Sequence, residues 1–269
     1  IYTNVAVTDD RQPWWEGLNS ERPQRLTDWQ SRPHDPANGP AAHPNARFTV
    51  SMKQCPTYAT EAEDPQGVPI SAIIFGGRRA QLAPLVFEAR DWRHGVFVDS
   101  AVASETTAAA AGAVGEVRRD PMAMKLFCGY NFADYWTHWL SFADAPDADR
   151  LPRVFHVNWF RKGKDGAFVW PGFGENMRVL IWILDRCEGR GEVRETPVGL
   201  VPATDGIAKE GLALGPEALE ELLAVDDQAW LQEAEEPAGF YRAFGDRLPD
   251  ALWAELGGLR RRLGKDEAA

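Results

Sequence analysis

The apolar run Val68-Pro-Ile-Ser-Ala-Ile-Ile-Phe75 stops abruptly at Gly76-Gly77-Arg78-Arg79. Such a run predicts a buried strand, and ligands collect at strand ends in α/β proteins. The two glycines would let backbone N–H groups approach an anion, and a planar guanidinium can clamp two phosphate oxygens. The alternative is a tight turn with surface arginines, which the short motif alone favours.

The rest of the chain mixes strand and helix patterns. Residues 8–46 are dense in turn formers and predict a long irregular segment. Strands are predicted at 47–55 and 152–160, and helices at 130–142, 175–187, 216–224, 226–236 and 249–263. We therefore expect a mixed α and β fold of the α/β class with a helical C-terminal tail.

Charge and cysteine content exclude several classes of protein. The formal net charge is −11, which argues against a general nucleic-acid binder. Residues 202–269 hold 15 acidic and 7 basic side chains, so the body before this acidic tail is nearly balanced and can host an anion. Cys55, Cys128 and Cys187 form no Cys-x-x-Cys pair, which predicts a reducing cytoplasm rather than a disulfide framework. With no leader-like or membrane-spanning run, we expect a cytoplasmic protein without membrane contact.

Asn45-Ala46-Arg47 places an amide and a guanidinium two residues apart, on one face of the predicted strand. The pair can orient a small carboxylate or phosphate. Taken alone, the pattern fits a strand start with a solvated arginine better.

The segment from Phe160 to Asn176 carries Phe160, Phe168 and Phe173 around glycine turns, together with Trp159 and Trp170. Aromatic faces can sandwich a purine, each stack contributing about 1–3 kcal/mol. A side-chain amide such as that of Asn176 can then read the base edge. An aromatic minicore under a hairpin explains the pattern equally well.

Other candidates are less specific. The Ala-rich residues 106–111, closed by Gly112 and Gly115, predict either a buried helix or a mobile lid. We expect His138 and His156 to be core histidines and Cys128 to be a buried small hydrophobe. No His-Glu-x-x-His, Ser-His-Asp order or Gly-x-x-x-x-Gly-Lys-[Ser/Thr] motif is present.

Together these segments resemble GTP-dependent phosphoenolpyruvate carboxykinase, specifically its C-terminal portion. The matching stretches run in family order across residues 1 to about 202: Ile1-Tyr-Thr-Asn-Val-Ala, Trp15-Glu-Gly, Asn45-Ala-Arg-Phe, Gln54-Cys-Pro, Gly67-Val-Pro-Ile, Ile74-Phe-Gly-Gly-Arg-Arg, His94-Gly-Val-Phe-Val, Ser104-Glu-Thr-Thr-Ala-Ala-Ala, Asp120-Pro-Met-Ala-Met, Gly129-Tyr-Asn-Phe, His156-Val-Asn-Trp-Phe and Trp170-Pro-Gly-Phe-Gly-Glu-Asn. Many matches in order are far more specific than any single motif.

The resemblance implies the family's fold, with mixed sheets, a mobile lid at about 104–116 and an acidic helical tail. Residues 1–202 would form the lobe that carries the sites, with 203–269 packed on it. The implied reaction converts oxaloacetate and GTP to phosphoenolpyruvate, GDP and CO2, in gluconeogenesis. The implied substrate residues are Asn45, Ala46 and Arg47; the GTP residues are Arg47, Arg78, Phe160, Phe168, Phe173, Gly174, Glu175 and Asn176; the lid residues are Ser104, Glu105, Thr106, Thr107, Ala108, Ala109, Ala110 and Gly112. Residues 111–114 are Ala-Gly-Ala-Val, so lid latches made by bulkier side chains are not carried over.

The resemblance also implies missing parts. The family's phosphate loop, its catalytic cysteine and lysine, and its Mn²⁺ ligands would all lie upstream of Ile1, so no catalytic or metal-binding residue is expected in this chain. GTP or GDP would be handled with Mg²⁺ or Mn²⁺. We expect a chain cut from a longer, monomeric enzyme and inactive without its N-terminal part. The alternatives are a non-catalytic guanine-nucleotide-binding fragment and a Trp-rich carbohydrate-binding protein, although neither explains the ordered matches.

Overall fold

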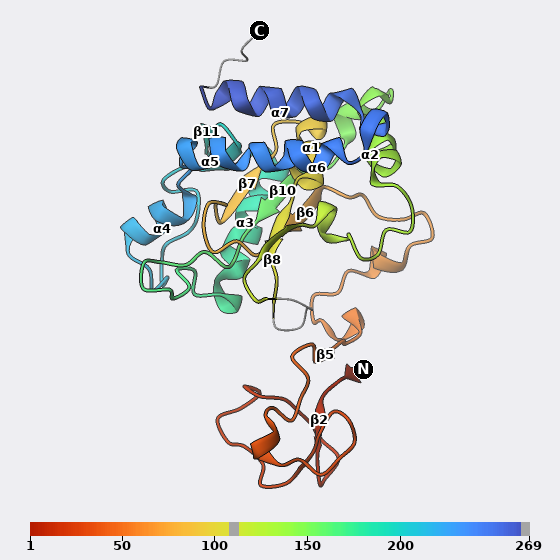
Figure 1. Cartoon of the computed structure of the whole chain (residues 1–269), viewed down its shortest axis with the longest axis vertical. Coiled ribbons are helices and arrows are strands. Elements are labelled where there is room, and N and C mark those ends of the chain that lie inside the picture. The colour runs from red at the N-terminus through yellow and green to blue at the C-terminus, as the bar shows by residue number, and fades with distance from the viewer. Residues whose placement is uncertain (108–112, 265–269) are drawn as a thin grey trace. The chain divides into compact units, whose positions relative to one another are not determined.

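The structure is a computed structural model that describes residues 1–107 and 113–264. The chain folds into two compact units (Figure 1). Unit 1 comprises Ile1–Pro69 and Thr106–Gly115, and unit 2 comprises Ile70–Glu105 and the chain from Glu116 onward. In the part of the chain that the structure describes, no helix is long and apolar enough to cross a membrane.

Unit 1 is built from very short strands and turns. Strand β1 pairs with β5, and β2 pairs with both β3 and β4, all antiparallel. Their bounds are β1 Tyr2–Thr3, β2 Ala6–Thr8, β3 Pro13–Trp14, β4 Leu26–Thr27 and β5 Arg47–Phe48, with 3-10 turns at Pro36–Asn38, Met52–Gln54 and Thr60–Glu63. The long irregular segment expected at 8–46 is therefore confirmed apart from two short strands.

The strand predicted at 47–55 is wrong beyond Phe48. The Ser51 hydroxyl accepts a hydrogen bond from the Lys53 N–H and starts the turn Met52–Gln54. A serine side chain that hydrogen-bonds to the backbone two residues ahead competes with strand pairing. The loose alternation of apolar residues in this stretch gave no sign of that competition.

Unit 2 is organised around a five-stranded sheet in the order β11-β12-β7-β10-β6, in which β10 and β6 are parallel and the other pairs antiparallel. The bounds are β6 Ala72–Gly76, β7 Val86–Glu88, β10 Arg153–Val157, β11 Val193–Thr196 and β12 Gly199–Pro202; a separate hairpin joins β8 Ala103–Glu105 to β9 Val117–Arg119. Because side chains alternate along a strand, Phe155 and Val157 belong to one core cluster, whereas Val154 contacts Gly95 on the opposite face.

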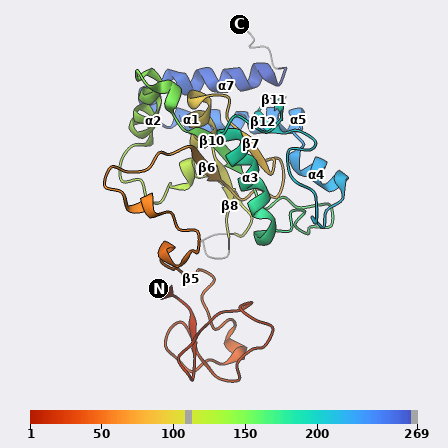
Figure 2. The ribbon, with the colours of Figure 1, turned by 180° about the vertical axis from the view of Figure 1, so that it is seen from behind.

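Helices cover both faces of this sheet (Figure 2). Their bounds are α1 Trp92–Ser100, α2 Phe132–Ser141, α3 Asn176–Cys187, α4 Pro216–Leu223, α5 Asp227–Glu233, α6 Glu235–Arg242 and α7 Asp250–Arg262. On one face, α3 and α4 pack Val179, Trp182 and Leu222 against the sheet. On the other, α1 and α2 share a core with tail helices α6 and α7 around Trp136 and Tyr241. The mixed α and β fold predicted from the sequence is confirmed, with the helices after residue 202 belonging to unit 2.

Two glycines within helices should respond to alanine with opposite signs. A Cβ on Gly95 of α1 would lie 2.7 Å from Val154 Cβ, so Gly95→Ala should destabilise the chain by about 1–2 kcal/mol through overpacking. A Cβ on Gly239 of α6 meets nothing within 4 Å, so Gly239→Ala should stabilise by about 0.5–1 kcal/mol. Urea denaturation measures both changes, and the same sign for both would contradict this account.

Candidate functional site

The arginine turn, residues 76–80, follows β6 at the carboxyl end of the parallel pair β6 and β10. Gly77 is required by close packing, because a Cβ there would lie 2.6 Å from the Ala103 carbonyl oxygen. The N–H groups of residues 78, 79 and 80 donate to Ser104 Oγ, Asn158 Oδ1 and Glu105 Oε1, at 3.0, 3.2 and 2.6 Å. These three N–H groups are used within the protein, so they are not available to an anion at this turn.

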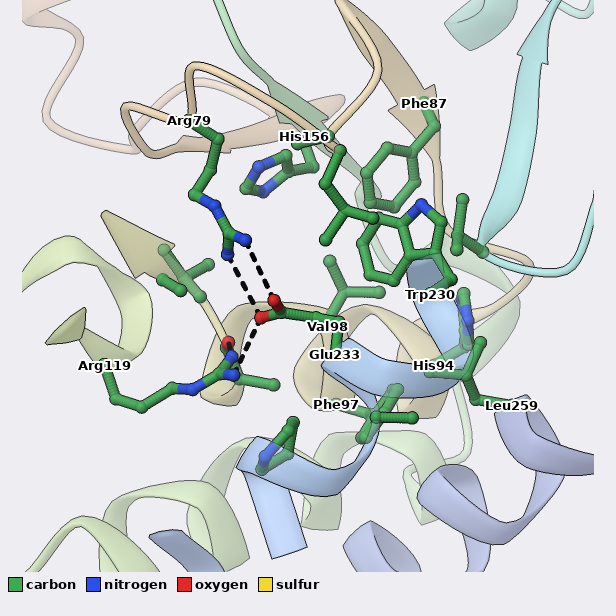
Figure 3. A pocket seen from close by; sticks show the side chains of 18 residues that line it. Arg79, Phe87, His94, Phe97, Val98, Arg119, His156, Trp230, Glu233 and Leu259 are labelled. Atoms are coloured by element: carbon green, nitrogen blue, oxygen red, sulfur yellow. Dashed lines mark hydrogen bonds and ion pairs between the residues drawn. The ribbon is translucent and has the colours of Figure 1, made fainter. Parts of the chain in front are cut away.

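The two arginines of the turn have different environments. Arg79 donates two hydrogen bonds to the Glu233 carboxylate, at 3.0 and 2.8 Å, and Arg119 donates a third at 2.7 Å (Figure 3). Arg78 is exposed, and its guanidinium carbon lies 5.0 Å from the centre of the Phe160 ring. Among the described residues Arg78 makes no ion pair, so its guanidinium is the one of the two available to an anion.

Charge explains why Arg79 and Arg119 stay together. Burial alone would raise the pKa of Glu233, but the hydrogen bonds and charges of Arg79 and Arg119 outweigh it and hold that pKa below its ordinary value. The carboxylate is therefore ionised at neutral pH and compensates both guanidinium groups. The triad Arg79–Glu233–Arg119, with two guanidinium groups and one carboxylate, therefore carries a net charge of +1.

A cavity of about 70 Å³ lies beside this triad, lined by aromatic and aliphatic side chains and by His94 and His156 (Figure 3). Burial, reinforced by the charge of Arg79, lowers the pKa of His156 to about 4. Burial, reinforced by Arg90 and Arg262, lowers the pKa of His94 to about 3. Both histidines are therefore neutral at pH 7, and the predicted core position of His156 is confirmed by its 7% exposure. The core position predicted for His138 is wrong, since that residue is exposed on α2, and Cys128 is only half-buried.

The aromatic segment 159–176 divides into a buried and an exposed part. Trp170 is 1% exposed and belongs to the core, whereas Phe168 and Phe173 are 57% and 95% exposed. The Phe160 and Phe168 rings meet edge to face with centres 5.9 Å apart, and Lys162 Nζ lies 5.4 Å from the Phe168 ring centre. The minicore interpretation therefore accounts for the tryptophan and not for the exposed phenylalanines.

The stretch Phe173–Glu175 forms a 3-10 turn that leads into α3 at Asn176. The Asn176 Oδ1 accepts a 2.8 Å hydrogen bond from Trp170 Nε1, which occupies the amide oxygen and leaves the NH₂ group as the remaining donor. The Glu175 carboxylate pairs with Arg178 instead. Of the predicted base-edge residues, Asn176 thus has a free donor, whereas Glu175 already has a partner.

The predicted substrate pair lies in unit 1. Arg47 Nε donates a 2.9 Å hydrogen bond to Asn45 Oδ1, so the two side chains meet as their spacing predicts, and the Ala46 N–H donates to the His43 carbonyl. Arg78 and the three phenylalanines belong to unit 2. Within unit 2 the structure brings Arg78, Phe160 and Phe168 together, while no ring contact joins Phe173 to another described residue.

Two predicted lid residues hold the arginine turn. Ser104 and Glu105, on β8, accept the N–H groups of residues 78 and 80, and the Glu105 N–H donates to the Arg78 carbonyl at 2.8 Å. Beyond them, the Thr106 hydroxyl donates to the Ala113 carbonyl, and the Gly115 N–H donates to the Thr106 carbonyl at 2.9 Å. Ala108, Ala109, Ala110 and Gly112 lie outside the described residues, and the lid stays a prediction.

The described residues do not fit a metal ion. Within 1–107 and 113–264, no three His, Cys, Asp or Glu side chains come together as a metal site requires. This part of the chain therefore offers no set of ligands for manganese.

Sequence reasoning missed two residues that shape this site, Asn158 and Glu233. Asn158 is fully buried between the arginine turn and Phe160, and Glu233 holds Arg79 from the tail. Each acts on partners at least 75 residues away in the sequence, apart from the local bond between Asn158 and Phe160. No local signal pointed to Asn158, because it lies inside the strand predicted at 152–160.

The fold and the site define an α/β protein with a cation and paired aromatic rings at the carboxyl end of two parallel strands, where such proteins place ligands. Residues 1–262 match the family model described as the phosphoenolpyruvate carboxykinase C-terminal P-loop domain. The chain belongs to the GTP-dependent phosphoenolpyruvate carboxykinase family.

Named relatives agree with this family. The chain is 50% identical over 265 residues to "Phosphoenolpyruvate carboxykinase [GTP]" of Renibacterium salmoninarum and 48% identical over 264 residues to that of Chlamydia caviae. Each match covers 98% of this chain and 44% of the relative. The chain therefore spans less than half the length of these curated relatives.

Proposed function

We propose that this chain works as the C-terminal part of a GTP-dependent phosphoenolpyruvate carboxykinase. The reaction is oxaloacetate plus GTP to phosphoenolpyruvate, GDP and CO2. The observation that carries the proposal is the placement of the exposed Arg78 guanidinium 5.0 Å from the Phe160 ring centre, beside Phe168. A guanidinium beside aromatic rings is suited to a phosphate next to a stacked base, which supports the proposal in a chain of the matching family.

The proposed roles follow from side-chain chemistry. Arg78 binds the nucleotide phosphates through its planar fork. Phe160, Phe168 and Phe173 stack on guanine, and the stretch Gly174, Glu175 and Asn176 reads the base edge, with the Asn176 NH₂ group as its free donor. In unit 1, Asn45, Ala46 and Arg47 bind oxaloacetate, whose carboxylates suit a guanidinium.

The reaction has two steps that need positioned charge. The bond between oxaloacetate and its departing carboxylate breaks, and its electron pair forms the enolate as CO2 leaves. The enolate oxygen then takes the γ-phosphoryl group, and the β–γ bridging oxygen leaves on GDP. Phosphoryl transfer depends on positioning and electrostatic stabilisation rather than on covalent chemistry by the protein, which is the role given to Arg78 and Arg47. Residues 104–116 would close over the reactive enolate and exclude water.

The proposal includes the dependence of this chain on the rest of the enzyme. We assign the phosphate loop, the catalytic cysteine and lysine, and the Mn²⁺ ligands to an N-terminal part of the enzyme outside this chain, which spans 44% of the relatives' length. The 269-residue chain alone should not form phosphoenolpyruvate from oxaloacetate and GTP, whereas the complete enzyme should. Turnover by the purified chain alone would refute this dependence.

The second candidate function is a non-catalytic fragment that binds guanine nucleotide. It is favoured by the exposed Arg78 guanidinium and the adjoining Phe160 and Phe168 rings, which can bind a nucleotide without any chemistry. Titration of GTP into the isolated chain, followed by tryptophan fluorescence, separates the two candidates. Tight binding supports the fragment, and weak or absent binding supports the half-site of an enzyme.

The aromatic pair gives a graded test of the guanine site. Phe168→Ala in the complete enzyme should raise KM for GTP roughly tenfold, because one base stack contributes about 1–3 kcal/mol. Steady-state kinetics with GTP varied at saturating oxaloacetate measure the change. Phe142→Ala is the control, since Phe142 is also exposed but lies at the end of α2. Equal KM values for the two variants would refute the stacking role of Phe168.

A further inference from the structure

Asn158 is a fully buried side chain with every hydrogen-bonding position occupied. It follows β10 directly and is 0% exposed. Its Oδ1 accepts from the N–H groups of Arg79 and Phe160, each at 3.2 Å. Its Nδ2 donates to the carbonyls of Arg79 and Ala83, at 2.8 and 3.1 Å. A primary amide has two donors and two acceptor lone pairs, so this side chain is completely satisfied.

These four bonds join two strand ends. The arginine turn leaves β6 at Gly76, and the segment carrying Asn158 and Phe160 leaves β10 at Val157, directly opposite in the parallel register. The pairing of β6 with β10 ends at those two residues. Beyond them, the Asn158 side chain hydrogen-bonds to both the backbone N–H and the backbone carbonyl of Arg79, the residue that follows Arg78. It also accepts a hydrogen bond from the backbone N–H of Phe160.

The consequence is a fixed relation between Arg78 and Phe160. An exposed arginine on a glycine-rich turn would otherwise sample many positions. The Asn158 amide holds the backbone next to Arg78 and the backbone of Phe160, and the Arg78 guanidinium carbon lies 5.0 Å from the centre of the Phe160 ring. A cation–π contact at an exposed position is too weak to set that distance without a rigid backbone.

We propose that Asn158 is a positioning residue that couples the phosphate contact of Arg78 to the base contact of Phe160. The ligand it serves is a purine nucleoside triphosphate, which must meet both groups at once. This inference rests on the proposed function and assigns it a residue that touches neither the nucleotide nor the oxaloacetate.

The chemistry of the side chain explains why asparagine stands here. An aspartate has no donor for the carbonyls of Arg79 and Ala83, and a leucine serves none of the four groups. Serine can keep one donor and one acceptor. Buried backbone N–H and carbonyl groups left without partners cost free energy, so the backbone would shift to expose them to water. The arginine turn would then lose its fixed position.

The test measures KM against kcat in the complete enzyme. Asn158→Ala should raise KM for GTP roughly tenfold or more, because a displaced contact group loses binding geometry, while KM for oxaloacetate stays unchanged. Asn158→Ser should give an intermediate value, and it carries the test if the alanine variant does not fold. Leu219→Ala is the control: it removes a 4% exposed side chain of α4 from the core on one face of the sheet and, among the described residues, has no hydrogen bond to the turn, so it should lower stability and leave KM for GTP unchanged.

A purely structural role predicts a different pattern, in which Asn158→Ala and Leu219→Ala both lose active protein and keep both KM values. That result would overturn the inference. A double-mutant cycle with Arg78→Ala adds a second readout. If Asn158 acts through Arg78, its effect on KM for GTP should shrink in the Arg78→Ala background, and full additivity would overturn the coupling.

The cycle also separates this inference from the proposed function. If Arg78→Ala leaves GTP kinetics unchanged, the proposed phosphate site itself fails. If Arg78→Ala impairs GTP use and the Asn158 variants behave as the Leu219→Ala control, only the positioning role fails.

Discussion

Arg78→Ala in the complete enzyme should lower kcat/KM for GTP by about 100-fold or more. The guanidinium is exposed, lies over the Phe160 ring and makes no ion pair with any described residue. Arginine side chains that stabilise a transferring phosphoryl group contribute factors of about 10³ to 10⁵ in other enzymes. An arginine that binds the nucleotide phosphates in both the ground state and the transition state should contribute less than that. Its loss should still lower kcat/KM for GTP strongly.

The comparison with lysine tests the geometry of this contact. Arg78→Lys keeps the charge but loses the planar fork, so its kcat/KM for GTP should lie between the parent and Arg78→Ala. Arg242→Ala is the matched control, because Arg242 is exposed on α6 and makes no ion pair with any described residue. Steady-state kinetics with GTP varied measure all three variants. An unchanged kcat/KM in Arg78→Ala would refute the phosphate role.

The sequence distinguishes Arg78 from Arg79 only through the family resemblance. The two residues are adjacent, and the local pattern gives them equal claims to an anion. The structure separates them physically, because Glu233, 154 residues from Arg79, neutralises one and leaves the other exposed. Partners this distant in the chain leave no local signature, which is also why Asn158 was missed.

Helix boundaries in the tail follow from apolar periodicity. The helices predicted at 216–224 and 249–263 are confirmed as Pro216–Leu223 and Asp250–Arg262. The helix predicted at 226–236 is confirmed over α5, Asp227–Glu233, but the sequence did not predict the break at Ala234 or the second helix, α6, from Glu235 to Arg242. Pro237 has no N–H to continue α5, but it is tolerated in the first turn of a new helix. The apolar period continued across this break and hid it.

The guanine segment shows a different limit of sequence reasoning. Five aromatic residues between 159 and 173 supported a ring site and a minicore equally. The structure places Trp170 in the core and leaves Phe168 and Phe173 exposed. Which aromatic residues are buried depends on the packing of α3 and the sheet against Trp170, a tertiary contact that composition and spacing do not report.

Glu233→Gln should destabilise the chain by about 3 kcal/mol, because removing one partner of a mostly buried ion pair leaves its charges uncompensated. Glu233 accepts bidentate hydrogen bonds from Arg79 and a further bond from Arg119. All three side chains are only 13–15% exposed, so the two guanidinium groups would face each other with little water between them. Glu236→Gln is the control: Glu236 is exposed on α6 with no ion pair to a described residue, and its change should stay within about 0.5 kcal/mol.

The pH dependence of unfolding identifies the carboxylate as the source of this stability. Arg79 and Arg119 hold the pKa of Glu233 below its ordinary value of 4.5, against the opposing effect of burial. A group whose pKa is lower in the folded state contributes its stability fully above the unfolded pKa, and loses it as pH falls through the folded pKa. The gap in free energy of unfolding between the parent and Glu233→Gln should therefore be constant above about pH 5 and close in more acidic solution, where protonated Glu233 resembles glutamine. Urea denaturation from neutral pH downward measures this gap, and a gap that persists undiminished in acid would show that the stability does not come from the charge of Glu233.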